Sequence, residues 1–240
     1  MTIKMPKQWV IPDIHGYVKT LKALLDQIRP AKEDELYFLG DYIDRGPDSK
    51  GLIDFLMQMK KSGVKARFLK GNHEDYLVQA WEDEQNLKSF LGFKQKNRKK
   101  AEWLAVGGKE TLKSFGTKNL AHIPFEYIDW MRNLEYYIIL EKFILVHAGF
   151  NFDKEDIFED RDAMLWCREF EVDLKKTGGR RLIHGHVPVS HEFIDHCIRK
   201  DTYTFFDIDN GVYVKNKNGF GNLTAFEMNS NTLIVQPCID

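Results

Sequence analysis

Residues 40–51 read GDYIDRGPDSKG and follow directly on the apolar run Leu36–Leu39. The apolar run predicts a buried strand, so the charged stretch begins where that strand ends. An ordinary surface turn needs a glycine or an aspartate, whereas Asp41, Asp44 and Arg45 bring three charges to one short loop. The stretch is therefore either a solvated loop with many charges or a loop that binds something at the end of a strand.

The first third of the chain alternates strand and helix patterns. Short apolar runs at residues 9–11, 36–39 and 64–69 predict strands, and apolar residues at helical spacing predict helices at 18–28 and 52–59. This order is typical of an α/β unit with parallel strands, whose loops at the carboxyl ends carry the chemistry. A short polar side chain of Asp48 or Ser49 is predicted to cap the second helix.

The rest of the chain differs from this unit. Residues 75–130 have helical character and are rich in aromatic residues and lysine, so we interpret them as a helical insertion, here called the cap. Its basic run Lys94–Lys100 is predicted to be a solvated face; the alternative is a patch that attracts an anionic substrate. Residues 136–146 predict a hairpin, and the alternation at 204–235 predicts antiparallel strands.

Composition limits the class of protein. The 240 residues include 35 basic and 36 acidic residues, a net charge of -1, which argues against a nucleic-acid or membrane-surface binder. Three cysteines without a CxxC pair fit a reducing compartment. With no signal peptide or membrane-length apolar run, we expect a soluble, cytoplasmic, single-domain protein over residues 1–240. The sequence leaves the oligomeric state open, a monomer included.

Five predicted strands end in the same narrow set of residue types. These ends read DIHG (13–16), GDYIDRG (40–46), GNHE (71–74), HAG (147–149) and HGH (184–186). Any one of them alone would be read as a turn with a structural histidine or aspartate. Five together, at strand ends that a parallel sheet brings to one edge, predict a divalent metal site. No cysteine joins them, which disfavours structural zinc.

A pair of metals suits phosphate chemistry. Two divalent ions about 3.5–4 Å apart need a bridging carboxylate, and Asp41 is well placed for that role. Such a pair turns a shared water into a hydroxide nucleophile and clamps the oxygens of an in-line displacement. Arg45 can add a two-pronged contact to phosphate oxygens.

The ordered motifs PDIHG, GDYIDRG, GNHE, HAG and HGH resemble those of the PPP-type metallophosphoesterases, over residues 9 to about 223. That family includes serine/threonine phosphoprotein phosphatases and symmetrical dinucleoside tetraphosphate hydrolases. The resemblance implies the calcineurin-like fold, a four-layer α/β sandwich in which helices flank a central β-sandwich, here with the cap inserted. It also implies two divalent metal ions, manganese first, with iron and zinc as alternatives.

The resemblance assigns roles to individual residues. The implied metal ligands, from the first metal through the bridge to the second, are Asp13, His15, Asp41, Asn72, His147 and His186. His73 would be the general acid, oriented and kept cationic by Asp44. Arg45 would bind the phosphate, and so would Arg168, which follows Leu165-Trp166 as in related bacterial enzymes. Other arginines compete for that last role, namely Arg161, Arg180 and Arg181.

Two positions depart from the family motifs, and three other residues are expected to have roles other than metal binding. Pro12 stands where the family usually has glycine and Val187 where it often has threonine, but the ligands beside them are intact, so activity is expected. Glu74 and His184 are predicted to support the ligands rather than to bind metal. Trp103 is predicted to pack within the cap.

The substrate is the least determined feature. The first hypothesis is a phosphomonoesterase that removes phosphate from phosphoserine or phosphothreonine in proteins, with phosphotyrosine or small phosphorylated compounds as further substrates. The second hypothesis is hydrolysis of symmetrical dinucleoside tetraphosphates, which a capped site with aromatic residues would suit. Trp103, Gly107, Gly108 and Thr111 resemble cap segments of small bacterial members of both kinds. A third, of another class, is a non-catalytic phosphate-binding regulatory module.

Overall fold

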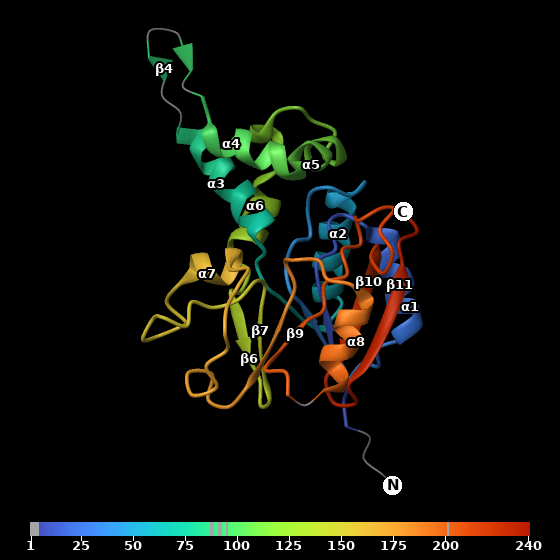
Figure 1. Cartoon of the computed structure of the whole chain (residues 1–240). Helices are drawn as coiled ribbons and strands as arrows, with labels where there is room; N and C mark the ends of the chain where they lie inside the picture. Colours follow the sequence, from blue (N-terminus) through green and yellow to red (C-terminus); the bar gives the residue numbers. More distant parts are fainter. Residues whose placement is uncertain (1–4, 87–88, 91–92, 95, 201) are drawn as a thin grey trace.

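Two β-sheets face each other at the centre of the molecule (Figure 1). The computed structural model describes residues 5–86, 89–90, 93–94, 96–200 and 202–240. The first sheet has the strand order β11-β10-β1-β2-β3 and the second has the order β6-β7-β8-β9. These are the two facing sheets of the predicted α/β sandwich.

The first sheet contains the predicted parallel unit. Its β1 pairs in parallel with β2, and β2 with β3, while β10 and β11 add antiparallel strands on the other side of β1. The helices α1 and α2 pack against this sheet. The bounds are β1 (Gln8–Ile11), α1 (Val18–Ile28), β2 (Glu35–Phe38), α2 (Ser49–Lys61), β3 (Lys65–Phe68), β10 (Asn222–Glu227) and β11 (Thr232–Pro237). The Asp48 side chain accepts a hydrogen bond from the Gly51 amide at 2.8 Å, which confirms the predicted cap of α2.

The second sheet corrects one prediction. The hairpin of β6 and β7 is confirmed, but β9 runs parallel to β8 in this sheet, and only β10 and β11 are antiparallel as predicted for 204–235. The crossover through α8 returns the chain in the same direction, which an alternating pattern cannot reveal. The bounds are β6 (Tyr137–Ile139), β7 (Phe143–Val146), α7 (Arg161–Trp166), β8 (Arg181–His184), α8 (His191–Arg199) and β9 (Phe205–Asp207).

The cap rises above the end of the sheets at which the parallel strands finish (Figure 1). Its elements are α3 (Asn72–Asn86), β4 (Ser89–Phe90), β5 (Phe93–Lys94), α4 (Arg98–Trp103), a π-helical turn (Leu104–Gly108), α5 (Lys109–Ser114), a 3-10 turn (Leu120–His122) and α6 (Phe125–Arg132). The segment is helical as expected, except for the short β4–β5 pair. Parts of the expected cap, residues 87–88, 91–92 and 95, lie outside the described residues.

Two lysines of the basic run hold cap helices together. Lys99 Nζ donates to Gln79 Oε1 at 2.6 Å, and Lys100 Nζ lies 3.5 Å from Glu84 Oε1. Both contacts join α4 to α3, which favours a structural role for this part of the run. Gln95, within the same run, lies outside the described residues.

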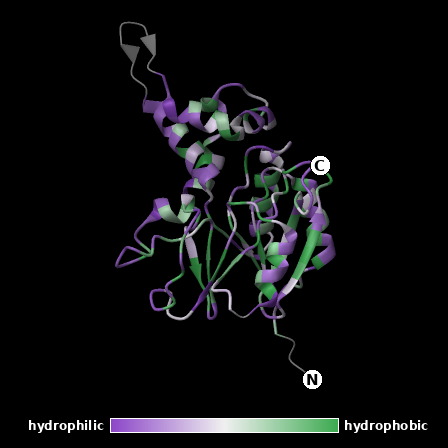
Figure 2. Ribbon diagram, viewed as in Figure 1, coloured by the Kyte–Doolittle hydropathy of each residue, from purple (hydrophilic) through white to green (hydrophobic). Residues whose placement is uncertain are grey.

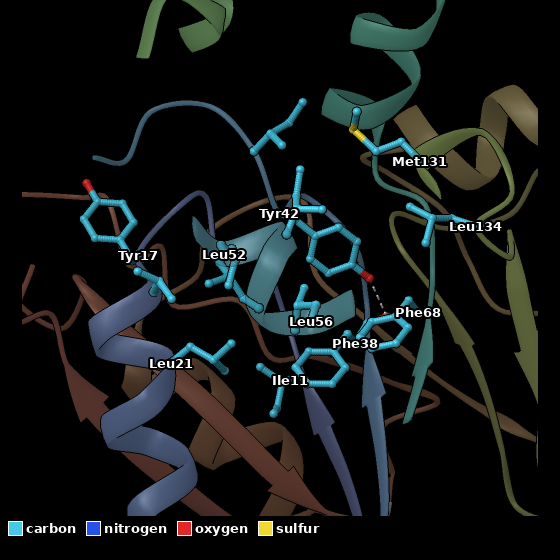
Figure 3. Packing of buried hydrophobic residues seen from close by; sticks show 14 of the residues in the cluster. Ile11, Tyr17, Leu21, Phe38, Tyr42, Leu52, Leu56, Phe68, Met131 and Leu134 are labelled. Atoms are coloured by element: carbon cyan, nitrogen blue, oxygen red, sulfur yellow. Dashed lines mark hydrogen bonds between the residues drawn. The ribbon is translucent and has the colours of Figure 1, made fainter. Parts of the chain in front are cut away.

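The apolar core forms on both faces of the first sheet. On the face toward α1 and α2, Tyr42 packs over Phe38 and Phe68, whose rings stack with centroids 5.0 Å apart (Figure 3). On the other face, side chains of both sheets meet between the layers. Figure 2 shows the resulting pattern, with hydrophobic strands inside and hydrophilic residues on the outer helices. Full burial of each large apolar side chain contributes about 1.5–3 kcal/mol.

In the described part of the chain, the longest apolar helical segments fall short of what is needed to cross a bilayer.

Candidate metal centre and its surroundings

The loops at the strand ends hold an unusual backbone. Five of the eight non-glycine residues with positive φ in the described chain are predicted site residues: His15 (49°), Asp41 (50°), Asp44 (71°), Arg45 (64°) and His186 (74°). Such backbone costs on the order of 1–3 kcal/mol per residue and persists only where the surroundings enforce it. Its concentration here indicates that these loops are shaped to aim side chains.

Glu74 is one of the groups that enforce this shape. Its carboxylate, in the first turn of α3, accepts hydrogen bonds from the amides of Asp41 (2.9 Å), Tyr42 (2.8 Å), Ile43 (3.2 Å) and Gly71 (3.0 Å). The expected supporting role of Glu74 is thus confirmed. It fixes the loop after β2 against the start of α3.

Asp41 lies between histidines of two other loops. One carboxylate oxygen is 3.6 Å from His15 Nε2, and the other is 3.6 Å from His147 Nε2. All three side chains are buried. A carboxylate with one oxygen toward each of two imidazoles has the arrangement that a bridging ligand requires.

Asn72, at the start of α3, connects the loops that carry His147 and His186. Its Oδ1 is 3.0 Å from His147 Nε2 and 3.0 Å from His186 Nδ1. The other ring nitrogen of His186 is buried and has no hydrogen-bond partner among the described residues. Asp41, His147 and His186 form one group whose ligand atoms lie within 4.8 Å of one another.

Asp13 was expected to bind the first metal together with His15, but it lies near the histidines expected at the second metal. Its carboxylate accepts from the His186 amide at 3.2 Å and lies 3.9 Å from His147 Nδ1. The group around His15 and Asp41, again within 4.8 Å, is completed instead by His73. All six predicted ligands nevertheless converge at one end of the sheets.

The electrostatics of these residues fit divalent metal ions. Burial, together with the nearby Asp209 and Asp41 carboxylates, raises the pKa of Asp13 well above its usual value. Burial lowers the pKa of His147, and that of His186 to about 3, so both imidazoles are neutral and able to ligate. Close buried carboxylates favour a cation between them. The oxygen and nitrogen donors suit manganese, iron or zinc.

His73 and Asp44 form a close pair. His73 Nδ1 is 2.7 Å from Asp44 Oδ2, and both side chains are buried. Burial opposes the charged imidazole, but the Asp41 and Asp44 carboxylates outweigh it and raise the pKa of His73. The pair therefore has the orientation and the proton affinity that a general acid needs.

Arg45 reaches from the same loop to two of these rings. Its Nη1 is 2.7 Å from His15 Nε2 and its Nη2 is 3.0 Å from His73 Nε2. The guanidinium lies over the Tyr213 ring, 4.2 Å from its centroid. Arg45 is thus held beside the candidate ligands, with its donors directed at the centre of the site.

The cap supplies residues that were not predicted as part of the site. Trp103 Nε1 donates to both carboxylate oxygens of Asp44, at 2.9 and 3.1 Å, and Thr111 Oγ1 donates to Asp44 Oδ1 at 2.6 Å. The Arg45 amide donates to the Gly107 carbonyl at 3.3 Å. Trp103 was expected only to pack, and it does so as well. The spacing of Trp103, Gly107 and Thr111 was visible, but their contacts with the loop after β2 were not.

Two further residues come from the loop after β9. The Tyr213 ring lies edge-on to His15, with centroids 5.1 Å apart, besides its contact with Arg45. Asp209 is buried, accepts from the Gly211 amide at 2.7 Å, and has an Oδ2 without a partner among the described residues. The sequence DIDNG at 207–211 is a sixth polar strand end and could have signalled this loop.

The contacts of the four candidate arginines separate them. Arg161 and Arg181 lie over aromatic rings away from the centre, and Arg180 donates to a backbone carbonyl. Arg168 is exposed and close enough to His186 for its charge to contribute to the lowered pKa of that ring. Arg168 also lines a cavity together with His184 and Gly185, which directly precede the predicted ligand His186, and none of its three competitors lines that cavity.

A two-sheet sandwich with this set of histidines, carboxylates and an asparagine at its strand ends defines a metallophosphoesterase. The chain belongs to the calcineurin-like phosphoesterase family, which matches residues 6–214.

Two of the curated relatives carry the same, more specific name. Over 144 residues the chain is 24% identical to a symmetrical bis(5′-nucleosyl)-tetraphosphatase of Nitrosospira multiformis, covering 59% of this chain and 42% of that protein. Over 82 residues it is 35% identical to the protein of the same name from Pseudomonas putida, covering 33% and 27%. The chain thus matches less than half the length of either relative.

The fold has relatives among solved structures. A protein serine/threonine phosphatase from Saccharomyces cerevisiae superposes with a TM-score of 0.62 at 12% identity, covering 98% of this chain and 81% of the yeast chain. At this identity the likeness concerns the fold alone.

Proposed function

We propose that this protein hydrolyses dinucleoside polyphosphates in a metal-dependent reaction, cutting a phosphoanhydride so that two nucleoside phosphates leave. The observation that carries hydrolysis of a phosphate group is the position of Asp41 between His15 and His147, next to Arg45 and the His73–Asp44 pair. The choice of substrate is supported by the names of the relatives from Nitrosospira and Pseudomonas. The first hypothesis from the sequence, a protein serine/threonine phosphatase, is not confirmed and becomes the competing candidate.

The ligand set has a defined task in this reaction. Two divalent ions would be held by Asp13, His15, Asp41, Asn72, His147 and His186. When bound, they supply Lewis acidity and lower the pKa of water near the phosphorus. Glu74 contributes indirectly, because it holds the Asp41 loop in its strained conformation.

The remaining residues bind the phosphate and move a proton. Arg45 and Arg168 bind non-bridging phosphate oxygens, whose charge grows toward the transition state. Asp44 accepts from His73 Nδ1 and so fixes the ring. In this structure His73 Nε2 faces the Arg45 donors; when Arg45 turns to the phosphate, Nε2 is freed to deliver a proton to the departing oxygen. A nucleoside phosphate leaves more readily than a serine alkoxide, so it needs this proton less.

The test compares substrates on one preparation. Purified protein with manganese is assayed on diadenosine tetraphosphate and on a phosphoserine peptide, with products separated by chromatography. We expect ADP as the product and a kcat/KM at least about tenfold higher for the dinucleotide. Turnover of the peptide alone would overturn the proposal in favour of a protein phosphatase. If neither of these substrates nor p-nitrophenyl phosphate is hydrolysed with manganese, iron or zinc, the result favours a phosphate-binding module instead.

A further inference from the structure

A cavity of about 340 Å³ opens beside the candidate metal centre, at the carboxyl ends of β8 and β9. Phe170, Phe193 and Phe205 give it apolar walls. Its volume lies at the lower end of the range for small-molecule sites, which are mostly apolar with a few placed polar groups. The walls therefore suit a flat ring and not an extended peptide.

One polar group at this cavity lacks a partner. His184 lines the cavity and is 7% exposed. Its Nδ1 is 3.1 Å from the Gly185 carbonyl, which can only accept, so Nδ1 carries the proton of the neutral ring. Nε2 is left as an acceptor, and it has no hydrogen-bond partner among the described residues. A buried acceptor of this kind favours a ligand that brings an N–H donor.

The surroundings of His184 support a ring-shaped ligand. Its imidazole lies against Phe170 and Phe205, with centroids 5.3 and 5.5 Å away. Asp207, opposite His184 in the β8–β9 register, is 4% exposed and lines the same cavity. The cavity thus offers aromatic faces together with two polar groups from neighbouring strands.

The cavity is joined to the candidate phosphate site. Arg168 and Gly185 both line it, and Gly185 directly precedes the predicted ligand His186. His186 follows His184 by two residues, so their backbones are at most about 7 Å apart. A ligand with its phosphates at the metals and its ring in the cavity would pass Arg168 on the way.

We propose that this cavity binds the base of a nucleotide substrate, with an exocyclic amino group of the base donating to His184 Nε2 and the ring lying against Phe170 and Phe205. The proposal rests on the proposed function and names the part of the substrate that is recognised. A phosphoserine side chain has neither a flat ring nor an N–H donor that could enter the cavity while its phosphate lies at the metals.

The test uses inhibition, so that it does not depend on which substrate is hydrolysed. The manganese enzyme hydrolyses p-nitrophenyl phosphate while ADP, purine riboside 5′-diphosphate or inorganic pyrophosphate is added. Purine riboside lacks only the exocyclic amino group. We expect ADP to inhibit about tenfold more strongly than the purine riboside compound, the worth of one good neutral hydrogen bond. Pyrophosphate should be weaker than both.

A variant assigns this difference to the cavity. In His184→Phe, which keeps a flat ring but removes the acceptor, the two nucleotides should inhibit equally. The control His196→Phe replaces an exposed histidine on α8 and should keep the tenfold difference. Equal inhibition by the two nucleotides in the native protein overturns the proposal, whether or not His184→Phe folds. If diadenosine tetraphosphate is not hydrolysed but ADP still inhibits about tenfold more strongly than purine riboside 5′-diphosphate, the proposed function is overturned and the base-binding cavity is not.

Discussion

At the scale of single residues, the side chains of the candidate site are held in place by hydrogen bonds from other buried residues. Asp41 has a left-handed backbone held by Glu74, and His73 is held by Asp44. All four of these side chains are buried, so none of them can turn toward solvent to relieve the crowding of charges. The histidines and carboxylates remain close together because the loops behind them are fixed.

Replacing His73 tests its role directly. His73→Asn should lower kcat by about 10²–10⁴-fold, the usual contribution of a general acid. The loss should be larger for an alkyl phosphate than for p-nitrophenyl phosphate, because the better leaving group needs no proton. Steady-state kinetics on both substrates measure the effect.

Metal content distinguishes the two possible roles of His73, which also lies in the group with His15 and Asp41. Metal analysis of His73→Asn should show the native content, with His122→Asn, an exposed histidine in the cap, as the control. A loss of bound metal in His73→Asn alone would show that His73 is a ligand.

At the scale of elements, the cap is part of the site rather than a cover over it. Trp103 and Thr111, from either side of the π-helical turn, both donate to Asp44, which in turn holds His73. Gly107, with φ of 122°, allows the close approach, since a Cβ there would lie 2.8 Å from the Arg45 nitrogen. The position of the cap helices is thus coupled to the orientation of the candidate general acid.

Removing one of these hydrogen bonds should affect turnover more than binding. Thr111→Val keeps the shape but removes the shorter of the two hydrogen bonds to Asp44 Oδ1 and leaves that oxygen with Trp103 Nε1 as its donor. Losing this hydrogen bond to a buried carboxylate should cost about 1–3 kcal/mol. We expect kcat to fall about tenfold with little change in KM. Thr111→Ser, which keeps the hydroxyl, should restore most of the rate. Equal losses in the two variants would mean that the methyl group, and not the hydrogen bond, matters.

Another element-level contact ties β1 to the hairpin of β10 and β11. Glu227 accepts from the Gln8 amide at 2.9 Å and from the Ser230 amide and hydroxyl at 2.7 and 2.6 Å. Burial opposes its charge, but the hydrogen bonds from Ser230 and Gln8 outweigh it and lower the pKa of Glu227 below 4.5. Its stabilisation is therefore present above pH 4.5 and is lost as pH falls through the lower folded-state pKa.

Glu227→Gln should show this dependence. At pH 7 the free energy of unfolding should fall by about 1.5–3 kcal/mol, because hydrogen bonds to a charged acceptor are lost. The difference from the native protein should shrink in urea titrations repeated at progressively lower pH, below 4.5. A difference that stays constant with pH would show that the carboxylate charge is not involved.

At the scale of the whole molecule, the metal centre joins parts that are far apart in the chain. Asp13, Asn72 and His186 belong to loops from both sheets, so ions bound there would link the two layers. Metal ions that bind only the folded state stabilise it by mass action. At a free metal concentration of a hundred times the dissociation constant, this stabilisation is about 2.7 kcal/mol.

Metal removal should therefore change stability and activity together. Protein treated with a chelator and then dialysed should lose hydrolysis of p-nitrophenyl phosphate and unfold at a lower temperature. Adding manganese should restore both, while calcium, which prefers oxygen ligands, should restore less. Retention of full activity after chelation, with metal analysis confirming removal, would contradict a metal-dependent reaction.

The sequence by itself determined the parallel α/β unit, the hairpin of β6 and β7, and the types of residue at the strand ends. These features follow from local rules, namely hydrophobic periodicity, turn chemistry and the meeting of parallel strand ends at one edge. Only the tertiary structure decided that β9 runs parallel to β8, that Trp103 and Thr111 hold Asp44, and that Arg168 rather than its competitors shares a cavity with His184 and Gly185. These contacts join segments tens of residues apart, and which of them form depends on how helices and loops pack, a property that no local pattern carries.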